Sequence, residues 1–281
     1  MSPTYNELYF SIRNTLRAAD VSSPELEARL IAEKASGKTR EEYIRDGYLP
    51  APMEVIAFAE GCAERRLLGE PVAHITGEWE FYSLPFYVDR GTLIPRTDSE
   101  ALVSRAVELL RGASKPRVLD LCAGSGCLGI AVSKNVCGTS LTLADISPAA
   151  LEICEKNAER NGVDATLAAL NALEPPPAGC EFDMILCNPP YIPSGDFDAL
   201  DSSVRDFEPR IALDGGKDGL DFYRAVAPNW KKALRDGGYL LFECGIGQSE
   251  AVRGILESEG YSNIKITDDT AGIPRVTEAE K

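Results

Sequence analysis

The pattern of apolar and polar residues changes twice along this 281-residue chain. Through residues 1–72 the apolar positions follow helical spacing, as at Leu8, Ile12 and Leu16. Over residues 77–95 aromatic and β-branched residues are broken by turn residues, which is typical of a β-hairpin. From residue 96 onward, short apolar runs alternate with helical patterns. We therefore expect an N-terminal helical domain (1–72), a β-hairpin linker (73–95) and a larger α/β domain (96–281).

Capping signals mark the expected helices of the first region. Ser23-Pro24 begins a helix that carries Leu26 and Leu30 and ends at Gly37. Further signals are the capping box Thr39-x-x-Glu42 and the apolar residues Val55, Phe58 and Cys62 after Pro52. These short helices are expected to pack together as one small domain.

The third region is expected to form a Rossmann-like α/β domain, with a mainly parallel seven-stranded sheet covered by helices on both faces. A capping box, Thr97-x-x-Glu100, precedes its first helix at 101–110. Strands are expected at 117–121, 140–144, 165–167, 182–187 and 238–243, and helices near 127, 147, 220–234 and 248. Extended runs at 263–267 and 275–277 add an antiparallel edge hairpin. The connection at 188–218 is unusually long, and its turn residues predict an ordered loop.

Composition and charge disfavour several classes of function. The formal net charge of −15 argues against nonspecific binding to phosphate backbones. No stretch is long and apolar enough for a membrane span, and the N-terminus lacks a signal-peptide pattern, so we expect a cytoplasmic protein without membrane attachment. The eight cysteines form no CxxC pair and are interpreted as reduced thiols. Because His74 is the only histidine, we expect neither a metal site nor a His-assisted triad.

A glycine-rich turn follows the first strand of the third region. Its G-x-G-x-x-G motif at 124–129 would let the backbone approach a nucleotide-like ligand, and it fits NAD as well as S-adenosylmethionine. Asp120 favours S-adenosylmethionine, because a carboxylate there can face the amino-acid or sulfonium side of that ligand; alternatively it caps a backbone turn. Asp145 ends the second strand and can accept two ribose hydroxyls; alternatively it begins an Asx-turn.

A second polar turn, Asn188-Pro189-Pro190-Tyr191, follows an apolar run that predicts a buried strand. Ligands of α/β sheets bind at the carboxyl ends of strands. Asn188 offers an amide oxygen, the prolines fix φ and remove backbone donors, and Tyr191 adds a ring face. Such a turn could hold a planar N–H donor, such as an amide or an exocyclic amine awaiting alkylation. The alternative is a stiff loop with a purely structural role.

The acidic strand ends, the glycine turn and the NPPY tetrad together resemble those of class I S-adenosylmethionine-dependent methyltransferases. Along most of the chain the resemblance is to the glutamine-N5 methyltransferases of peptide chain release factors, the PrmC/HemK family. Besides the glycine turn and the tetrad, the matching segments are 71–72, 77–82, 93–96, 208–210 and 215–220. Two segments depart from the family pattern. They are 97–100, where relatives carry a second proline and acidic residues, and 171–172, where relatives carry an acidic residue and an aromatic one.

The resemblance implies methyl transfer from S-adenosylmethionine to a glutamine amide nitrogen in the Gly-Gly-Gln loop of a release factor, with S-adenosylhomocysteine as product. The Asn188 side-chain oxygen and the Pro189 carbonyl would each accept one amide N–H, and Tyr191 would pack against the amide plane. These three are the implied catalytic residues, and Pro190 and Arg96 complete the substrate site. The expected cofactor residues are Asp120, Cys122, Ala123, Gly124, Ser125, Gly126, Asp145, Ile146, Asn171 and Asn188.

Three other functions stay open at this point. An adenine-N6 methyltransferase of DNA or RNA would place a flipped base in the same pocket, although the acidic charge and the release-factor-like segments argue against it. An NAD-binding oxidoreductase is supported only by the glycine motif, and a non-catalytic binding module by no particular residue. We expect a monomer without stable nucleic-acid binding, in which the helical domain either recognises the substrate or serves as a stabilising appendage.

Overall fold

The computed structural model describes residues 2–281 and divides the chain into two compact units. The first unit comprises the described residues up to Glu78 together with Ser202–Phe207, and the second comprises Trp79–Asp201 and Glu208–Lys281. The long connection after the NPPY tetrad therefore leaves the second unit and returns to it. Among the described residues, no helix is long and apolar enough to cross a membrane.

The first unit is built from short helices, and α1 and α3 among them begin at a capping box. They are α1 (Tyr5–Ala18), α2 (Pro24–Ser36), α3 (Arg40–Arg45), α4 (Met53–Leu67), α5 (Val72–Thr76) and α9 (Ser202–Arg205). Helix α1 buries Leu8, Ile12 and Leu16, as its spacing predicts. Helix α2 begins at Pro24 and ends at Gly37, as predicted, and it buries Ala28 and Ile31 while Leu26 is 41% exposed. The buried face of α2, which also includes Glu27 and Ala32, packs against α1 and α4.

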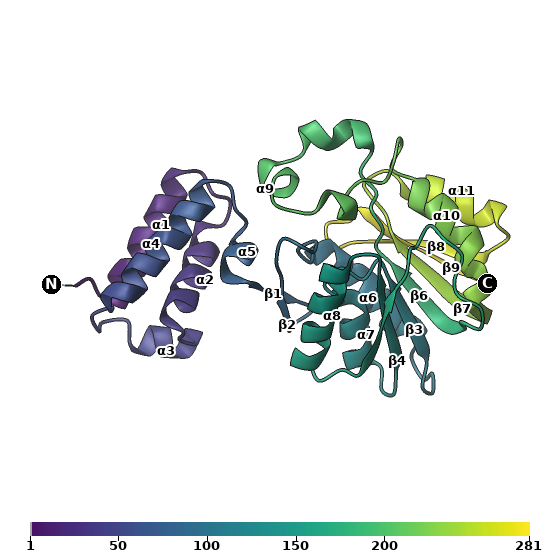
Figure 1. The fold of residues 1–281 in the computed structure, drawn as a ribbon, viewed down its shortest axis with the longest axis horizontal. Helices are drawn as coiled ribbons and strands as arrows, with labels where there is room; N and C mark the ends of the chain where they lie inside the picture. The colour runs from purple at the N-terminus through teal and green to yellow at the C-terminus, as the bar shows by residue number, and fades with distance from the viewer. Residues whose placement is uncertain (1) are drawn as a thin grey trace. The chain divides into compact units, whose positions relative to one another are not determined.

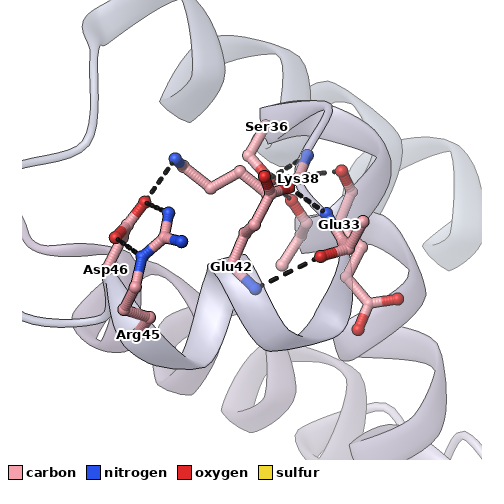
Figure 2. A network of polar contacts seen from close by, with 8 residues as sticks. Glu33, Ser36, Lys38, Glu42, Arg45 and Asp46 are labelled. Atoms are coloured by element: carbon pink, nitrogen blue, oxygen red, sulfur yellow. Dashed lines mark hydrogen bonds and ion pairs between the residues drawn. The ribbon is translucent and has the colours of Figure 1, made fainter.

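A network of polar contacts fixes the corner between α2 and α3 (Figure 2). The expected capping box is present, with Thr39 and Glu42 bonding reciprocally to each other's backbone. The Nζ atom of Lys38 lies 2.7 Å from Asp46, and the Nε atom of Arg45 donates to the same carboxylate at 2.8 Å. Hydrogen bonds from Arg45 and then Lys38 lower the pKa of Asp46. Gly37 ends α2 in the left-handed conformation, as expected.

The second unit begins with the predicted hairpin, formed by β1 (Glu78–Phe81) and β2 (Leu84–Tyr87). Both turn residues, Tyr82 and Ser83, have positive φ, as in a type I′ turn. The Oε1 atom of Glu100 accepts a hydrogen bond from the Tyr82 backbone at 2.8 Å. The expected capping box at 97–100 was therefore wrong. A short 3₁₀ turn, Thr97–Ser99, precedes α6 (Glu100–Leu109), and the glutamate serves the hairpin instead.

The seven-stranded sheet has the order β5-β4-β3-β6-β7-β9-β8, and the predicted mainly parallel α/β fold is confirmed (Figure 1). Its parallel strands are β3 (Arg117–Leu121), β4 (Ser140–Asp145), β5 (Ala165–Ala169), β6 (Phe182–Cys187) and β7 (Leu234–Glu243). The final strands β8 (Ser262–Asp268) and β9 (Pro274–Glu280) are antiparallel. The chain fills the sheet outward from β3 in one direction and then from β6 in the other. The carboxyl ends of β3 and β6 thus flank the switch point at which such sheets bind ligands.

Helices cover both faces of the sheet, and alternate residues of each strand face opposite layers. Met184 and Leu186 pack with the residues of α6, α7 (Cys127–Asn135) and α8 (Pro148–Arg160), whereas Ile185 and Cys187 face α10 (Asp221–Trp230) and α11 (Ser249–Ser258). This is why β6 reads as a continuous apolar run. Strand β7 begins four residues earlier than expected, because α10 ends at Trp230 in a 3₁₀ turn.

The long connection at 188–218 has definite structure, as its turn chemistry predicts. It contains the 3₁₀ helices Ser194–Ala199 and Arg210–Ala212 as well as α9. Ile192 and Asp214 form a parallel bridge that brings the two ends of the connection together. The NPPY tetrad is therefore backed by the returning chain.

Candidate active site

The glycine turn between β3 and α7 combines open backbone with close packing. Gly124 has a φ of +56°, and a Cβ placed there would meet no atom within 4 Å. At Gly129 a Cβ would lie 2.9 Å from the Cβ of Asp120 and 2.8 Å from a methyl of Leu141. The first glycine thus leaves room for a ligand, and the last lets α7 lie directly on the sheet.

The Asp145 carboxylate is held by two backbone donors at the end of β4. Its Oδ2 atom accepts from the Gly124 N–H and its Oδ1 atom accepts from the Ser147 N–H, both at 2.9 Å. Asp145 also lines the cavity at this edge of the sheet. Each carboxylate oxygen has a second lone pair, so the group is oriented by the protein and can still accept two hydroxyls. Asp145 thus forms the Asx-turn that was the alternative interpretation, and it also lines the cavity.

Asp120 lies beneath the glycine turn and does not line the cavity. Its side chain is fully buried, and its Oδ2 atom accepts from the Gly129 N–H at 2.8 Å. Within residues 2–281 its Oδ1 atom has no hydrogen-bond partner. Burial raises the pKa of Asp120 to about 8, so the carboxyl is largely protonated at neutral pH. The structure thus corrects the expectation of a cofactor-facing carboxylate, because Asp120 fastens the first turn of α7 to β3.

A cavity of about 220 Å³ joins the glycine turn to the NPPY tetrad. The predicted residues that line it are Arg96, Cys122, Ala123, Gly124, Ser125, Asp145, Ile146, Asn171, Asn188 and Pro190. Gly126, Pro189 and Tyr191 do not line it. Residues that sequence reasoning missed include Thr92, Leu93, Pro95, Ser99, Ser147, Leu173, Pro209, Ile211 and Phe222. Most of these come from loops, where no periodic pattern marks a residue as facing a ligand.

Neighbouring segments hold the NPPY tetrad from several sides. The Tyr191 carbonyl accepts from the Gln248 side chain at 2.9 Å. Gly215 lies so close behind the turn that a Cβ there would be 2.7 Å from the Tyr191 Cα and 2.8 Å from the Pro190 carbonyl oxygen. Burial raises the pKa of Tyr191. Gln248 and the returning chain at Gly215 therefore pack directly against the turn.

Two polar side chains that the sequence reasoning missed, Ser99 and Glu243, lie beside Asn188. The Asn188 Nδ2 atom is 3.5 Å from the Ser99 Oγ atom. Glu243 ends β7 and is buried. Burial raises the pKa of Glu243 to about 7, and interactions with Ser99 and Asn188 partly offset that rise. Glu243 could have been found by the reasoning applied to Asp120, because it too is an acidic residue at the end of an apolar strand.

Arg96 lines the main cavity and also a second hollow, which Tyr191 lines as well. Its guanidinium pairs with Glu208, whose side chain is 1% exposed. Burial raises the pKa of Glu208, and the charge of Arg96 opposes that rise. Arg96 thus faces the cleft, as expected, and also compensates a buried carboxylate where the long connection returns to the second unit.

Comparison with known proteins places this fold and site in a family. One family model, the methyltransferase small domain, matches residues 98–202, and another, the PrmC N-terminal domain, matches residues 7–77. The chain is thus a class I methyltransferase that uses S-adenosylmethionine. The release factor glutamine methyltransferase of Geobacter sulfurreducens is 39% identical over 264 residues, which cover 94% of this chain and 92% of that one. The enzyme of the same description from Koribacter versatilis is 34% identical and covers 99% of both chains. The chain belongs to the release factor glutamine methyltransferase family.

Solved structures at lower identity share the fold. The hMettl16 catalytic domain in complex with an RNA hairpin has a TM-score of 0.56 at 15% identity, covering 78% of this chain and 81% of that one. The 16S rRNA methyltransferase RsmC of Thermus thermophilus, solved with AdoMet and guanosine, has a TM-score of 0.50 at 22% identity and covers 73% of this chain and 49% of that one. These likenesses concern the fold alone.

Proposed function

We propose that this protein transfers a methyl group from S-adenosylmethionine to the side-chain nitrogen of the glutamine in the Gly-Gly-Gln loop of a peptide chain release factor. The observation that carries the proposal is one continuous cavity lined both by the oriented Asp145 carboxylate and by the Asn188 carboxamide. Family membership supplies the substrate class, because the relatives are named release factor glutamine methyltransferases.

The cofactor end of the cavity suits S-adenosylmethionine. The free lone pairs of Asp145 would accept the ribose hydroxyls, and the open position at Gly124 would admit the ligand next to the backbone. Cys122, Ala123 and Ser125 would complete the wall from the glycine turn. When bound, the cofactor supplies an electrophilic methyl group on its sulfonium. Asp120 would act from below by holding α7 in position.

The substrate end of the cavity would orient a weak nucleophile. An amide nitrogen is a poor nucleophile and is very costly to deprotonate, so positioning and electrostatics must supply most of the rate. The Asn188 oxygen would accept one N–H of the glutamine amide and stabilise the positive charge that develops on the nitrogen as the C–N bond forms and the C–S bond of the sulfonium breaks. One N–H proton would then leave the methylated nitrogen to solvent. We assign the second acceptor to the Pro189 carbonyl on the strength of the family resemblance, since Pro189 is buried next to the cavity without lining it.

The second hollow offers a route for the substrate loop. It is lined by Tyr191, Arg96 and the Gly245–Gly247 segment, among other residues. Small glycine residues on the protein side leave room for a peptide backbone. We propose that the Gly-Gly-Gln loop enters here, with Tyr191 packing against the amide plane.

We assign recognition of the rest of the release factor to the helical unit. Its surface carries large apolar side chains, including Tyr48 at 86% exposure and Met53 at 65%. Exposed apolar groups of this size are typical of surfaces that bind other proteins. The chain would act as a cytoplasmic monomer without stable nucleic-acid or membrane binding, in keeping with its charge of −15.

The proposal is tested by incubating the protein with purified release factors and S-adenosylmethionine that carries a labelled methyl group. We expect label in the tryptic peptide that contains the Gly-Gly-Gln motif, and none when its glutamine is replaced by alanine. Label in DNA or RNA and not in the release factor would favour the adenine-N6 alternative. A thermal shift with NAD and none with S-adenosylhomocysteine would favour the oxidoreductase.

A further inference from the structure

We propose that Glu243 is a positioning residue for the reaction, which holds the Asn188 carboxamide with its nitrogen toward the protein and its oxygen toward the substrate. This inference rests on the proposed function, because it concerns the same acceptor. Glu243 lies on another strand, and its proposed role is to determine whether the Asn188 side-chain oxygen or nitrogen faces the cavity.

The sheet register brings the two residues side by side. Cys187 of β6 is the partner of Phe242 in β7, so Asn188 and Glu243, the residues that follow them, lie at the same level on adjacent parallel strands. Glu243 is 1% exposed, and Asn188 is half-buried and lines the cavity. Ser99 is also buried at this point, and its Oγ atom lies 3.5 Å from the Asn188 nitrogen. Asn188 thus has a buried oxygen-rich side and an open side.

The chemistry of an amide explains why the buried side matters. The Asn188 side chain has one NH₂ group with two donors and one oxygen that accepts only. Ser99 and Glu243 both offer oxygen atoms, and the Ser99 Oγ atom accepts from the Asn188 Nδ2 atom at 3.5 Å. When the NH₂ group faces them, the Asn188 oxygen is left for the cavity. A flipped amide would bring two oxygen atoms together inside the protein and present donors to the substrate N–H.

The surroundings keep Glu243 available for this role. The guanidinium of Arg275, whose charge opposes the rise of the Glu243 pKa, already donates to Asp98, to Asp269 and to the Cys244 carbonyl. Within residues 2–281 the Oε2 atom of Glu243 has no hydrogen-bond partner. The other titratable groups that influence Glu243, or are influenced by it, are Asp98, Tyr191, Tyr223, Cys127 and Cys244. None of these is a cation, so Glu243 is not locked into a closed ion pair.

A dependence on pH follows from the same contacts. Burial raises the pKa of Glu243 to about 7, while Ser99, Arg275 and Asn188 oppose the rise. A protonated Glu243 becomes a donor that can bond to the Asn188 oxygen and favour the flipped amide. Turnover should therefore fall as the pH drops through about 7, with the KM for the release factor changing less than kcat.

The test compares Glu243→Gln with wild type, and uses Glu278→Gln as a matched control. Glu278 is a buried carboxylate on the neighbouring strand β9, but it pairs with Arg105 away from the cavity. We expect Glu243→Gln to lower kcat by roughly 10- to 100-fold, in the range seen when one preorganised transition-state contact is lost. Affinity for S-adenosylhomocysteine should stay within about threefold by the same reasoning, since the cofactor end is untouched. The acid limb of the kcat profile should disappear in Glu243→Gln and persist in Glu278→Gln. Equal kcat and an unchanged acid limb in Glu243→Gln would overturn the proposal.

A spectroscopic measurement separates this proposal from the proposed function. In protein labelled with ¹⁵N, the side-chain NH₂ signals of Asn188, assigned by their loss in Asn188→Ala, should titrate near pH 7 in wild type. They should shift and lose that titration in Glu243→Gln or, if that variant does not fold, move in Ser99→Ala. Signals that do not respond to pH or to either variant would overturn the positioning role. Failure of wild type to methylate a release factor would instead count against the proposed function, and these signals would still report on Glu243.

Discussion

The Asp145 carboxylate offers the sharpest test of the cofactor end, because its two oxygens have different partners that an amide cannot both satisfy. In Asp145→Asn, one of the two backbone donors, Gly124 N–H or Ser147 N–H, would face an NH₂ group instead of an oxygen. The substitution also removes the negative charge and one of the two acceptors proposed for the ribose hydroxyls.

The size of the effect follows from these lost contacts. A hydrogen bond to a charged group contributes about 1.5–3 kcal/mol, and about 1.4 kcal/mol corresponds to a tenfold change in affinity. Losing one such bond to the ligand should therefore weaken binding by roughly 10- to 100-fold. Isothermal titration with S-adenosylhomocysteine measures this directly. Asp164→Asn, which neutralises an exposed carboxylate before β5, is the matched control and should bind as wild type does. A dissociation constant for Asp145→Asn within threefold of wild type would refute the reasoning.

Three further predictions concern turnover, packing and pH. Asn188→Ala should lower kcat by about 10²-fold, and normal turnover in a rapid-quench assay would remove Asn188 from the mechanism. Gly129→Ala should lower the free energy of unfolding measured in urea by about 1–3 kcal/mol, because the new Cβ would lie under 3 Å from side chains of β3 and β4. Gly254→Ala, in open space on α11, should leave that free energy unchanged or raise it. The folded-state pKa of Glu243, about 7, exceeds the ordinary glutamate value of 4.5, so the native state holds an extra proton between those values. The unfolding free energy should thus fall as the pH rises from about 4.5 to about 7, by an amount on the order of 3 kcal/mol, and Glu243→Gln should flatten that slope.

The sequence predicted the fold well where local patterns and global packing agree. The apolar run of β6 predicts a strand buried on both faces, and the strand order places its carboxyl end at the switch point. The Thr39 capping box formed as expected because both partners lie three residues apart on one helix. The box at Thr97 failed because Glu100 found a better partner 18 residues away, in the backbone of Tyr82. A competing donor of that kind is invisible to local reasoning.

The site was predicted less completely, for a geometric reason. Motifs indicate which strand ends meet at the cavity, but they do not indicate which way each side chain points. Asp120 and Asp145 both lie near strand ends, yet Asp120 turns inward to Gly129 and only Asp145 faces the cavity. Likewise Ser99 and Glu243 join Asn188 only because distant segments converge there. The roles of all these residues in catalysis stay predictions.

The central claim is that the cavity methylates a release-factor glutamine, and one measurement tests it most directly. Wild-type protein, a purified release factor and S-adenosylmethionine are incubated, and the tryptic peptides are sequenced by tandem mass spectrometry, with Asn188→Ala as the parallel reaction. The account predicts a mass gain of one methyl group, located on the Gly-Gly-Gln glutamine in the wild-type reaction and strongly reduced in the variant. An unmodified glutamine after complete incubation, with active S-adenosylmethionine and intact proteins, would contradict it.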